Sequence, residues 1–235
     1  MHTSAGRASV LIVGASRGLG FAIAQEYAAR GARVIATARR EAPPALAALR
    51  ERHPDRVEIE HVDIDDPAQI DALSTRLRGR TLDLLFVVAG VSLAPVDQPA
   101  ADIATEAFVR TMTTNALGVM RTVERLADRV AASGTIAVMS SGQGSVANNT
   151  SGGFEVYRAS KAALNQLMRS YAARHAEEGP TLLLLAPGWV RTDMGGAAAG
   201  LEIHEAIPPL VDTVEAQSGT PGLRYLDRHG ATVPW

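Results

Sequence analysis

The sequence contains no cysteine among its 235 residues, and this absence excludes several kinds of site at once. Disulfide frameworks, thiolate zinc sites, iron–sulfur clusters and cysteine nucleophiles all need that side chain. The six histidines form no i, i+4 pair around a carboxylate, so no metal site is predicted. Neither Ser140 nor Ser141 lies in the glycine-flanked turn of a serine hydrolase. Any catalysis by this chain must therefore rely on other chemistry.

Charge of one sign is also lacking, because 23 basic residues stand against 25 acidic ones, for a formal net charge of -2. This balance predicts neither a nucleic-acid partner nor an anionic membrane, so small molecules are the expected partners. Long apolar runs are missing too. The strongest, 84–89 and 182–186, fall far below the ~20 residues of a membrane-spanning helix. With no apolar leader in residues 1–8, we expect a cytoplasmic protein.

Hydrophobic residues make up 46% and charged residues 20% of the chain, as in ordinary folded domains. Short runs rich in Val, Ile and Leu alternate with longer stretches of helical period. This pattern predicts an α/β fold, a Rossmann-type doubly wound parallel sheet with helices on both faces, in a single domain over residues 1–235. The predicted strands, about seven in number, cover 9–13, 33–38, 57–62, 82–88, 135–140, 181–186 and 223–226.

Helix signals lie between these strands. Asp65 and Asp66 are interpreted as helix caps, and Pro67 suits the first turn of the helix that follows. Two long helices are predicted over 102–132 and 154–178, because glycine follows each of them.

The first predicted strand leads directly into a glycine-rich turn and then into a helical pattern. Glycine permits the tight turn and lets main-chain N–H groups approach a pyrophosphate, while the positive end of the helix favours an anion. A strand, a glycine turn and a helix in this order predict a dinucleotide site. The cofactor-binding residues expected here are Gly14, Ser16, Arg17, Gly18, Leu19 and Gly20.

The end of the second strand decides which dinucleotide is bound, because the adenosine ribose is recognised there. An NAD enzyme needs a carboxylate at this place, and the strand ends in ATARR. Arg39, together with Arg17, is suited to the 2′-phosphate of NADP(H), which is therefore the predicted cofactor. Glu41 is close enough to compete, and Arg40 is equally well explained as a surface arginine.

Tyr157 and Lys161 lie four residues apart, on the same face of the second long helix. Lys161 is the single lysine of the chain; the other basic residues are all arginine. A compact ammonium can donate to a ribose hydroxyl and can also lower the pKa of a neighbouring phenol, which is ordinarily ~10. Tyr157 is therefore the predicted general acid or base.

The glycine spacing and the Tyr-x-x-x-Lys pair resemble the short-chain dehydrogenase/reductase family. The segments YRASKAALN and PGWVRTDMGG and the final VPW look closest to its C-factor-like and sniffer-like carbonyl reductases. The resemblance implies a catalytic set of Ser141, Tyr157, Lys161 and Asn115. In this set Ser141 would bind the substrate carbonyl. Asn115 would bend its helix and hold a water that links Lys161 to solvent.

Two details of the resemblance leave alternatives open. Ser141 precedes Tyr157 by sixteen residues, a few more than is common in the family, so Ser140 or Ser145 could take its role. Val88 stands where the family usually has an asparagine. We expect this valine to alter the rigidity of the loop and to weaken cofactor binding.

The resemblance also implies cofactor contacts after the later strands. These are Asp63 and Ile64 at the adenine, Ala89 and Gly90 at the ribose, and Pro187, Gly188, Val190 and Thr192 at the nicotinamide. Trp189 is interpreted as a packing residue. The family further implies a homodimer or homotetramer formed through the long helices.

Together these features predict an NADPH-dependent oxidoreductase that reduces a ketone or aldehyde to an alcohol by hydride transfer, with Tyr157 as the general acid. The alternatives are an alcohol dehydrogenase working in the oxidative direction, and an NADPH-binding signalling or sensor protein. The substrate pocket is expected between 91–99, the glycine-rich loop 142–153 and the segment 194–209. This last segment is predicted to be a mobile, mostly apolar lid.

Overall fold

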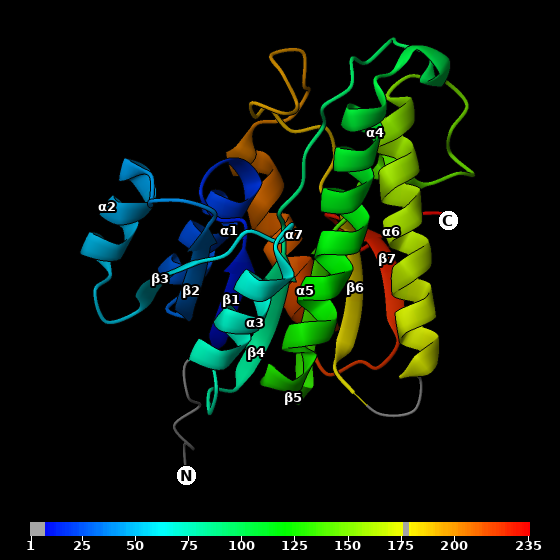
Figure 1. Cartoon of the computed structure of the whole chain (residues 1–235). Helices are drawn as coiled ribbons and strands as arrows, with labels where there is room; N and C mark the ends of the chain where they lie inside the picture. Colours follow the sequence, from blue (N-terminus) through cyan, green and yellow to red (C-terminus); the bar gives the residue numbers. More distant parts are fainter. Residues whose placement is uncertain (1–7, 176–178) are drawn as a thin grey trace.

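The structure is a computed structural model and describes residues 8–175 and 179–235. Its sheet has seven parallel strands in the order β3-β2-β1-β4-β5-β6-β7, with helices on both sides (Figure 1). The strands are β1 (Ser9–Val13), β2 (Arg33–Ala38), β3 (Val57–His61), β4 (Leu82–Val87), β5 (Val130–Met139), β6 (Thr181–Ala186) and β7 (Leu223–Asp227). The predicted Rossmann-type fold is confirmed.

The helices alternate with the strands along most of the chain. The α-helices are α1 (Gly18–Ala29), α2 (Pro44–Arg52), α3 (Pro67–Arg76), α4 (Thr105–Met112), α5 (Val119–Leu126), α6 (Glu155–Arg174) and α7 (Ile203–Gln217). The shorter turns are η1 (Ala100–Asp102), η3 (Ala127–Arg129) and η4 (Gly142–Gly144), and the π-helical segment η2 (Thr113–Gly118) joins α4 to α5. In the described part of the chain, no helix is both long and apolar enough to cross a membrane.

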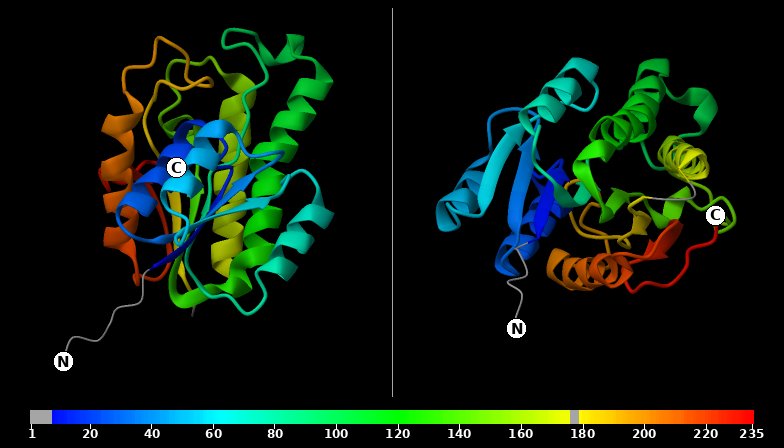
Figure 2. Two further views of the ribbon diagram at one scale, coloured as in Figure 1. Left: turned by 90° about the vertical axis from the view of Figure 1, so that its left-hand side faces the viewer. Right: turned by 90° about the horizontal axis from the view of Figure 1, so that it is seen from below.

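The sheet separates two apolar cores, because successive residues of a strand point to opposite faces. Leu11 and Leu85 pack on one face, beneath α3, α5 and α6. Ile12 and Phe86 pack on the other face, beneath α1, α2 and α7. Figure 2 shows the two helix layers, one on each side of the sheet. Strands buried on both faces explain the continuous apolar runs of the sequence.

The predicted single helix over 102–132 is wrong. The segment η2 interrupts it, and its last residues belong to β5, which begins at Val130. Leu82 pairs with Val130 and Leu84 pairs with Thr135, so the register shifts between the two pairs. The small residues that lie between Val130 and Thr135 carry no strand pattern, which is why the sequence misassigns them. Pairing with the neighbouring strand decides their conformation.

The predicted lid over 194–209 is wrong in its second half. Ile203 begins α7, and Ile207 is buried against the sheet. A capping box holds the start of this helix: Glu202 and Glu205 each accept a hydrogen bond from the other's main chain. Two adjacent prolines inside α7 conceal the helix in the sequence, because proline is rare there.

The second long helix ends earlier than predicted. The helix α6 stops at Arg174, and the predicted end at Glu178 lies outside the described residues. Asp66 caps α3 as predicted, because its side chain accepts a hydrogen bond from the N–H of Ala68.

The order of the strands fixes where a ligand can bind. β1 and β4 are hydrogen-bonded neighbours, although two strands separate them along the chain. The loops that follow β1 and β4 therefore lead away in opposite directions and leave a crevice at the carboxyl edge of the sheet.

Candidate active site

A cleft of about 490 Å³ opens at this carboxyl edge. Every residue predicted above to bind the cofactor or to catalyse the reaction lines it, except Asn115. These residues come from the loops after β1, β2, β3, β4, β5 and β6 and from α6, so the parallel sheet brings together segments that are far apart in the sequence. Among the described residues no group of three or more His, Asp or Glu side chains could hold a metal ion.

The glycine turn after β1 forms one wall of the cleft. Gly14 has a φ of +94°, and a Cβ added there would lie 2.7 Å from the main-chain nitrogen of Ala89. A Cβ on Gly20 would lie 2.1 Å from the carbonyl oxygen of Gly14. No other residue fits at either position without moving the backbone. The first turn of α1 consequently faces the cleft with free N–H groups, which suits an anion.

Two arginines lie at the end of the cleft next to β2. Arg39 lines the cleft, and its Nε lies 4.0 Å from an Asp63 carboxylate oxygen. Arg17 also lines the cleft and forms an ion pair of 2.7 Å with Asp193, in the loop after β6. Arg40 and Glu41 do not line it, so Arg39 supplies the charge at this strand end.

The loop after β3 lines the cleft beside these arginines. Asp63 and Ile64 lie there, as the resemblance implied. Asp65 is also part of the lining, and the interpretation of Asp65 as a helix cap is wrong. One of its carboxylate oxygens accepts a hydrogen bond from Thr114, and the other is buried without a partner among the described residues.

Tyr157 and Lys161 point from one face of α6 into the cleft, as their spacing predicted. The ammonium nitrogen of Lys161 lies 5.8 Å from the centre of the Tyr157 ring and donates to the carbonyl of Met139 at 2.9 Å. Burial lowers the pKa of Lys161 to about 8. Burial also raises the pKa of Tyr157 to about 12, although a hydrogen bond with Ser141 acts toward a lower pKa. The lowered pKa predicted for this phenol beside Lys161 is therefore wrong for the cofactor-free protein.

The three candidate serines differ in what their hydroxyls contact. Ser140 is buried, and its hydroxyl donates to Asn165 at 2.6 Å. Ser145 lies outside the cleft lining and accepts a hydrogen bond from a main-chain N–H. The Ser141 hydroxyl lies against Tyr157 in the cleft and accepts the N–H of Gln143 at 3.2 Å. Of the three, Ser141 has the geometry to act on a ligand together with Tyr157.

Asn115 lies behind the cleft, in the π-helical segment η2. Its amide donates to the carbonyl of Val91 at 2.8 Å and to the hydroxyl of Ser160 at 3.0 Å, and it accepts the N–H of Val91 at 2.8 Å. A Cβ on Gly90 would lie 3.3 Å from the Asn115 carbonyl oxygen and 3.5 Å from the Lys161 ammonium. Asn115 thus ties the loop after β4 to α6 from within the π-helical segment, and the bend expected from this residue stays a prediction. The water relay to Lys161 stays a prediction.

The loop after β6 closes the cleft opposite the glycine turn. Gly188 has a φ of +94°, and a Cβ there would meet both Leu201 and Arg228 within 2.8 Å. The hydroxyl of Thr192 accepts the N–H of Gly195 at 3.0 Å. The interpretation of Trp189 as a packing residue is wrong, because its side chain lines the cleft and is 54% exposed.

Val88 takes the place of the family's usual asparagine at the end of β4. Its side chain packs against the apolar core, and its N–H donates to the carbonyl of Val13 at 2.9 Å. The main chain therefore joins β1 to the loop after β4. The weaker cofactor binding expected from Val88 stays a prediction.

Tyr225 on β7 is a residue that the sequence analysis missed. Its buried hydroxyl donates to the main-chain carbonyl of Ser141. The ring of Trp235 packs on Tyr225 with 5.4 Å between centroids, and the carbonyl of Trp235 accepts the N–H of Ala147 at 3.0 Å. The end of the chain thereby braces the loop that carries Ser141. The sequence offers no signal for this contact, because 84 residues separate Tyr225 from Ser141.

Comparison with known proteins gives consistent matches. The profile of the family described as short chain dehydrogenase matches residues 8–200. A short-chain dehydrogenase/reductase of Burkholderia multivorans, whose crystal structure holds NADP, is 52% identical, with a TM-score of 0.95 over 97% of this chain and 100% of that one. A carbonyl reductase of Pseudomonas aeruginosa PAO1 in complex with NADP is 39% identical, with a TM-score of 0.90 over 98% of this chain and 100% of that one. C-signal of Myxococcus xanthus is 37% identical over 169 residues, which are 70% of this chain and 99% of C-signal.

Proposed function

The chain belongs to the short-chain dehydrogenase family, and on this premise we propose that it is an NADPH-dependent reductase that converts a ketone or an aldehyde into an alcohol. One observation carries the proposal: Ser141, Tyr157 and Lys161 meet in the same cleft as the glycine turn of β1. The proton donor, Tyr157, therefore faces the same cleft as the dinucleotide site.

The residues around the cleft fit a nicotinamide dinucleotide. Gly14 and Gly20 leave a cradle that any Cβ would fill, next to the N-terminus of α1. Arg39 and Arg17 would hold the 2′-phosphate of NADP by charge-assisted hydrogen bonds. The NADP bound by the proteins of B. multivorans and P. aeruginosa supports the same choice. When bound, this cofactor supplies the hydride.

In the proposed reaction Ser141 and Tyr157 donate hydrogen bonds to the carbonyl oxygen of the substrate. As negative charge develops on that oxygen, Tyr157 transfers its proton to it. The raised pKa of Tyr157, about 12, means that the phenol is protonated at neutral pH. Reduction requires this protonated form, whereas oxidation of an alcohol requires the phenolate. Arg39, rather than a carboxylate, lines the cleft at the end of β2, and the preference for NADPH that this arginine favours supports reduction over the oxidative alternative.

Lys161 stabilises the phenolate that remains after the proton has left. Its pKa of about 8 leaves the ammonium charged at neutral pH, although no carboxylate pairs with it in the described part of the chain. A buried cation beside the ring lowers the free energy of the phenolate. Asn115, through its bonds to Val91 and Ser160, would keep the loop after β4 and α6 in position.

The choice of cofactor can be tested without a substrate, by following reduced-nicotinamide fluorescence as NADPH or NADH is added. We expect NADPH to bind at least about tenfold more tightly than NADH, because charged hydrogen bonds hold the 2′-phosphate. Arg39→Gln should remove most of this preference. Arg40→Gln, a change outside the cleft, is the matched control and should keep it. Equal affinities in the wild type would contradict the assignment of NADPH.

The reaction is tested by Tyr157→Phe, which removes the proton donor and keeps the ring. We expect turnover of a carbonyl substrate to fall by roughly 10²–10⁴-fold while NADPH affinity is retained. Near-normal turnover would refute the role of Tyr157. A wild type that binds NADPH but reduces no carbonyl compound would instead support the sensor alternative.

We also propose that the chain is a homodimer or a homotetramer. Supporting this, the outer faces of η2 and α6 expose Leu117 and Leu167 beside Met112 in a shallow apolar groove. Light scattering should give a multiple of 24.7 kDa for the wild type and a smaller species for Leu167→Glu. A monomeric wild type at micromolar concentration would refute this proposal. The cytoplasmic location stays a prediction.

A further inference from the structure

Phe154 has an unusual backbone conformation. Its φ of 51° and ψ of 32° lie in the left-handed region, and it is the one residue other than glycine with a positive φ among the described residues. Bulky side chains rarely adopt this conformation, because the Cβ crowds the main chain. A strained residue persists where the surrounding structure holds it, and such residues cluster at functional sites.

The surroundings of Phe154 hold this conformation firmly. Gly152 and Gly153 also have positive φ values, 64° and 68°, so three successive residues form a left-handed turn before α6. The N–H of Phe154 donates to the carbonyl of Val96 at 2.7 Å. The guanidinium of Arg158 donates to the carbonyls of Gly153 at 2.9 Å and Gly152 at 3.0 Å. The turn is therefore joined both to the loop after β4 and to the first turns of α6.

This turn places Phe154 in the active-site cleft. Phe154 directly precedes α6, Tyr157 lies in the first turn of that helix, and both residues line the cleft. Glycine would fit this backbone without strain. The ring is therefore the feature that Phe154 adds to the cleft.

The cleft that Phe154 lines has further apolar side chains. Val91, Trp189 and Met194 line it together with Phe154, and Trp189 and Met194 are 54% and 50% exposed. Asp193, the charged residue next to Met194, is paired with Arg17. A wall of this kind favours a neutral, apolar substituent and offers no counterion to a charged one.

We propose that Phe154 determines substrate specificity, and that the substrate is a neutral ketone or aldehyde that carries a flat, ring-sized apolar group. The ring of Phe154 packs against this group and so orients the carbonyl toward Tyr157. The inference rests on the proposed function, because it presumes a carbonyl substrate in this cleft.

The test compares two methyl ketones that differ only in the second substituent, acetophenone and acetone. The measured quantity is the ratio of their kcat/KM values with NADPH. We expect the wild type to prefer acetophenone. We expect Phe154→Ala to reduce the ratio about tenfold or more, because contacts with the ring are lost in the transition state. Phe108→Ala, the same change on exposed α4, is the matched control and should leave the ratio unchanged.

A second variant tests whether the lost preference comes from the missing ring or from a disturbed fold. Phe154→Gly removes the ring as Phe154→Ala does but also relieves the left-handed strain, so its midpoint of thermal unfolding should equal or exceed that of Phe154→Ala. Its preference for acetophenone should nevertheless be lost, as in Phe154→Ala. Retention of NADPH affinity in both variants would show that the cofactor end of the cleft is intact.

The possible failures point to different conclusions. A ratio that is unchanged in both Phe154 variants, or an equal loss of activity toward both ketones, would refute the role of Phe154. A wild type that prefers acetone would refute the proposed substrate class. A wild type that binds NADPH but reduces neither ketone would refute the proposed function, and the inference with it.

Discussion

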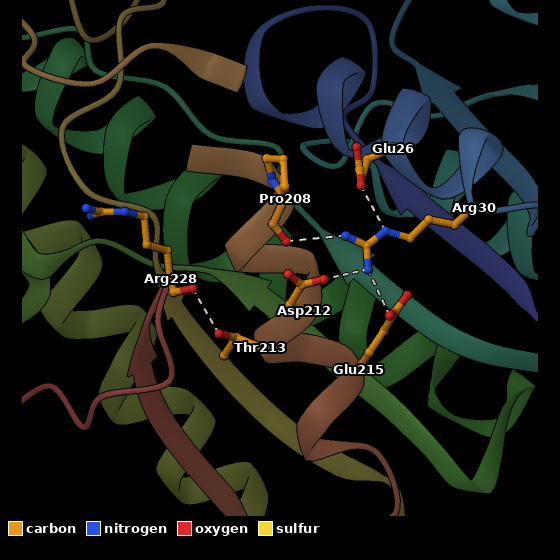
Figure 3. Close-up of polar contacts among 7 residues, drawn as sticks. All are labelled: Glu26, Arg30, Pro208, Asp212, Thr213, Glu215 and Arg228. Carbon is orange, nitrogen blue, oxygen red and sulfur yellow. Dashed lines mark hydrogen bonds and ion pairs between the residues drawn. The ribbon is translucent and has the colours of Figure 1, made fainter. Parts of the chain in front are cut away.

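The two faces of the sheet are covered by helices that bury different kinds of side chain. Beneath α1, α2 and α7 the buried polar groups of the helices are Thr213 and the hydroxyl of Tyr27. Thr213 donates to the carbonyl of Arg228 at 2.9 Å (Figure 3). On the other face, the segments from α4 to α6 bury Thr111, Thr114, Asn115, Thr122, Ser160, Lys161 and Asn165.

The charges of the first face lie on its outer surface. Arg30, the residue that follows α1, contacts Glu26 of that helix and both Asp212 and Glu215 of α7, at 2.7 to 2.9 Å (Figure 3). On the second face Lys161 is buried within the protein and donates to a main-chain carbonyl. The helices of the first face keep their charges at the solvent surface. The face that carries the site buries polar groups and holds each of them by hydrogen bonds.

The largest expected effect comes from removing the buried charge of the second face, and it is a loss of activity. Lys161→Met replaces the buried ammonium by an apolar side chain of similar length. We expect turnover to fall by roughly 10²–10⁴-fold, because the phenolate of Tyr157 loses its neighbouring cation. Steady-state reduction of a carbonyl substrate is the measurement.

Lys161→Arg is the control for charge alone. It should restore little activity, because Gly90 and Gly144 leave little room for a guanidinium. A Cβ at those two positions would already lie 3.5 Å from the Lys161 ammonium and 3.0 Å from its Cβ. Full activity in Lys161→Arg would mean that any buried cation suffices.

The second prediction compares the same truncation on the two faces. Leu210→Ala on α7 and Leu164→Ala on α6 each empty a fully buried site and should each cost about 2–5 kcal/mol of unfolding free energy. Leu164 lies one turn after Lys161, so its loss should also lower turnover per folded molecule. Denaturant unfolding and active-site titration separate the two effects. Equal turnover losses in both variants would remove the functional difference between the faces.

The third prediction concerns pH. The pKa of Lys161 is about 8 in the native protein and 10.5 ordinarily, so between these values the unfolded chain binds more protons. The contribution of Lys161 to the free energy of unfolding therefore rises as the pH increases from 8 to 10.5. Tyr157 has the opposite effect above pH 10, because its native pKa of about 12 keeps the proton on the native state. Its contribution to the free energy of unfolding therefore falls as the pH rises above 10.

Urea unfolding of the cofactor-free protein between pH 7 and 10 would check this dependence. The wild type should gain stability relative to Lys161→Met across that range. A difference between the two proteins that is independent of pH would contradict the lowered pKa of Lys161.

The smallest effect is expected for Arg30→Gln, which breaks the ion pairs on the outer surface of the first face. These groups are partly exposed, so the loss should be below about 1 kcal/mol of unfolding free energy. Carbonyl reduction should be unchanged. Thermal unfolding at low and high salt is the measurement, and the difference between the proteins should shrink at high salt.

Much of the fold could be predicted because it depends on local patterns. Buried strands read as apolar runs, and six of the seven predicted strands begin at the residue where the structure begins them. The exception is β5, whose first residues are held by pairing with Leu82 rather than by their own pattern. The second half of the predicted lid failed for a similar reason, since burial of Ile207 on the sheet stabilises α7 despite two prolines.

The residues of the candidate site also fall into two groups, those fixed by local spacing and those fixed by contacts between distant segments. Tyr157 and Lys161 were predictable because four residues along a helix fix their relation. Ser141 was the serine that the resemblance implied, but excluding Ser140 required the structure, because the hydroxyl of Ser140 donates to Asn165. Trp189 was misjudged because nothing in its neighbours along the chain indicates that it lines a cleft.

The sequence by itself determined the parallel α/β sheet, the glycine cradle and the Tyr–Lys pair, because periodicity, glycine conformation and helical spacing act between residues close in the chain. The tertiary structure alone decided which serine faces Tyr157, how Tyr225 braces the carbonyl of Ser141, and that Phe154 is held in a left-handed turn. Each of these depends on a contact with a distant segment, as Tyr225 and Ser141 show across 84 residues. Such contacts exist only after the sheet has brought the ends of its strands together.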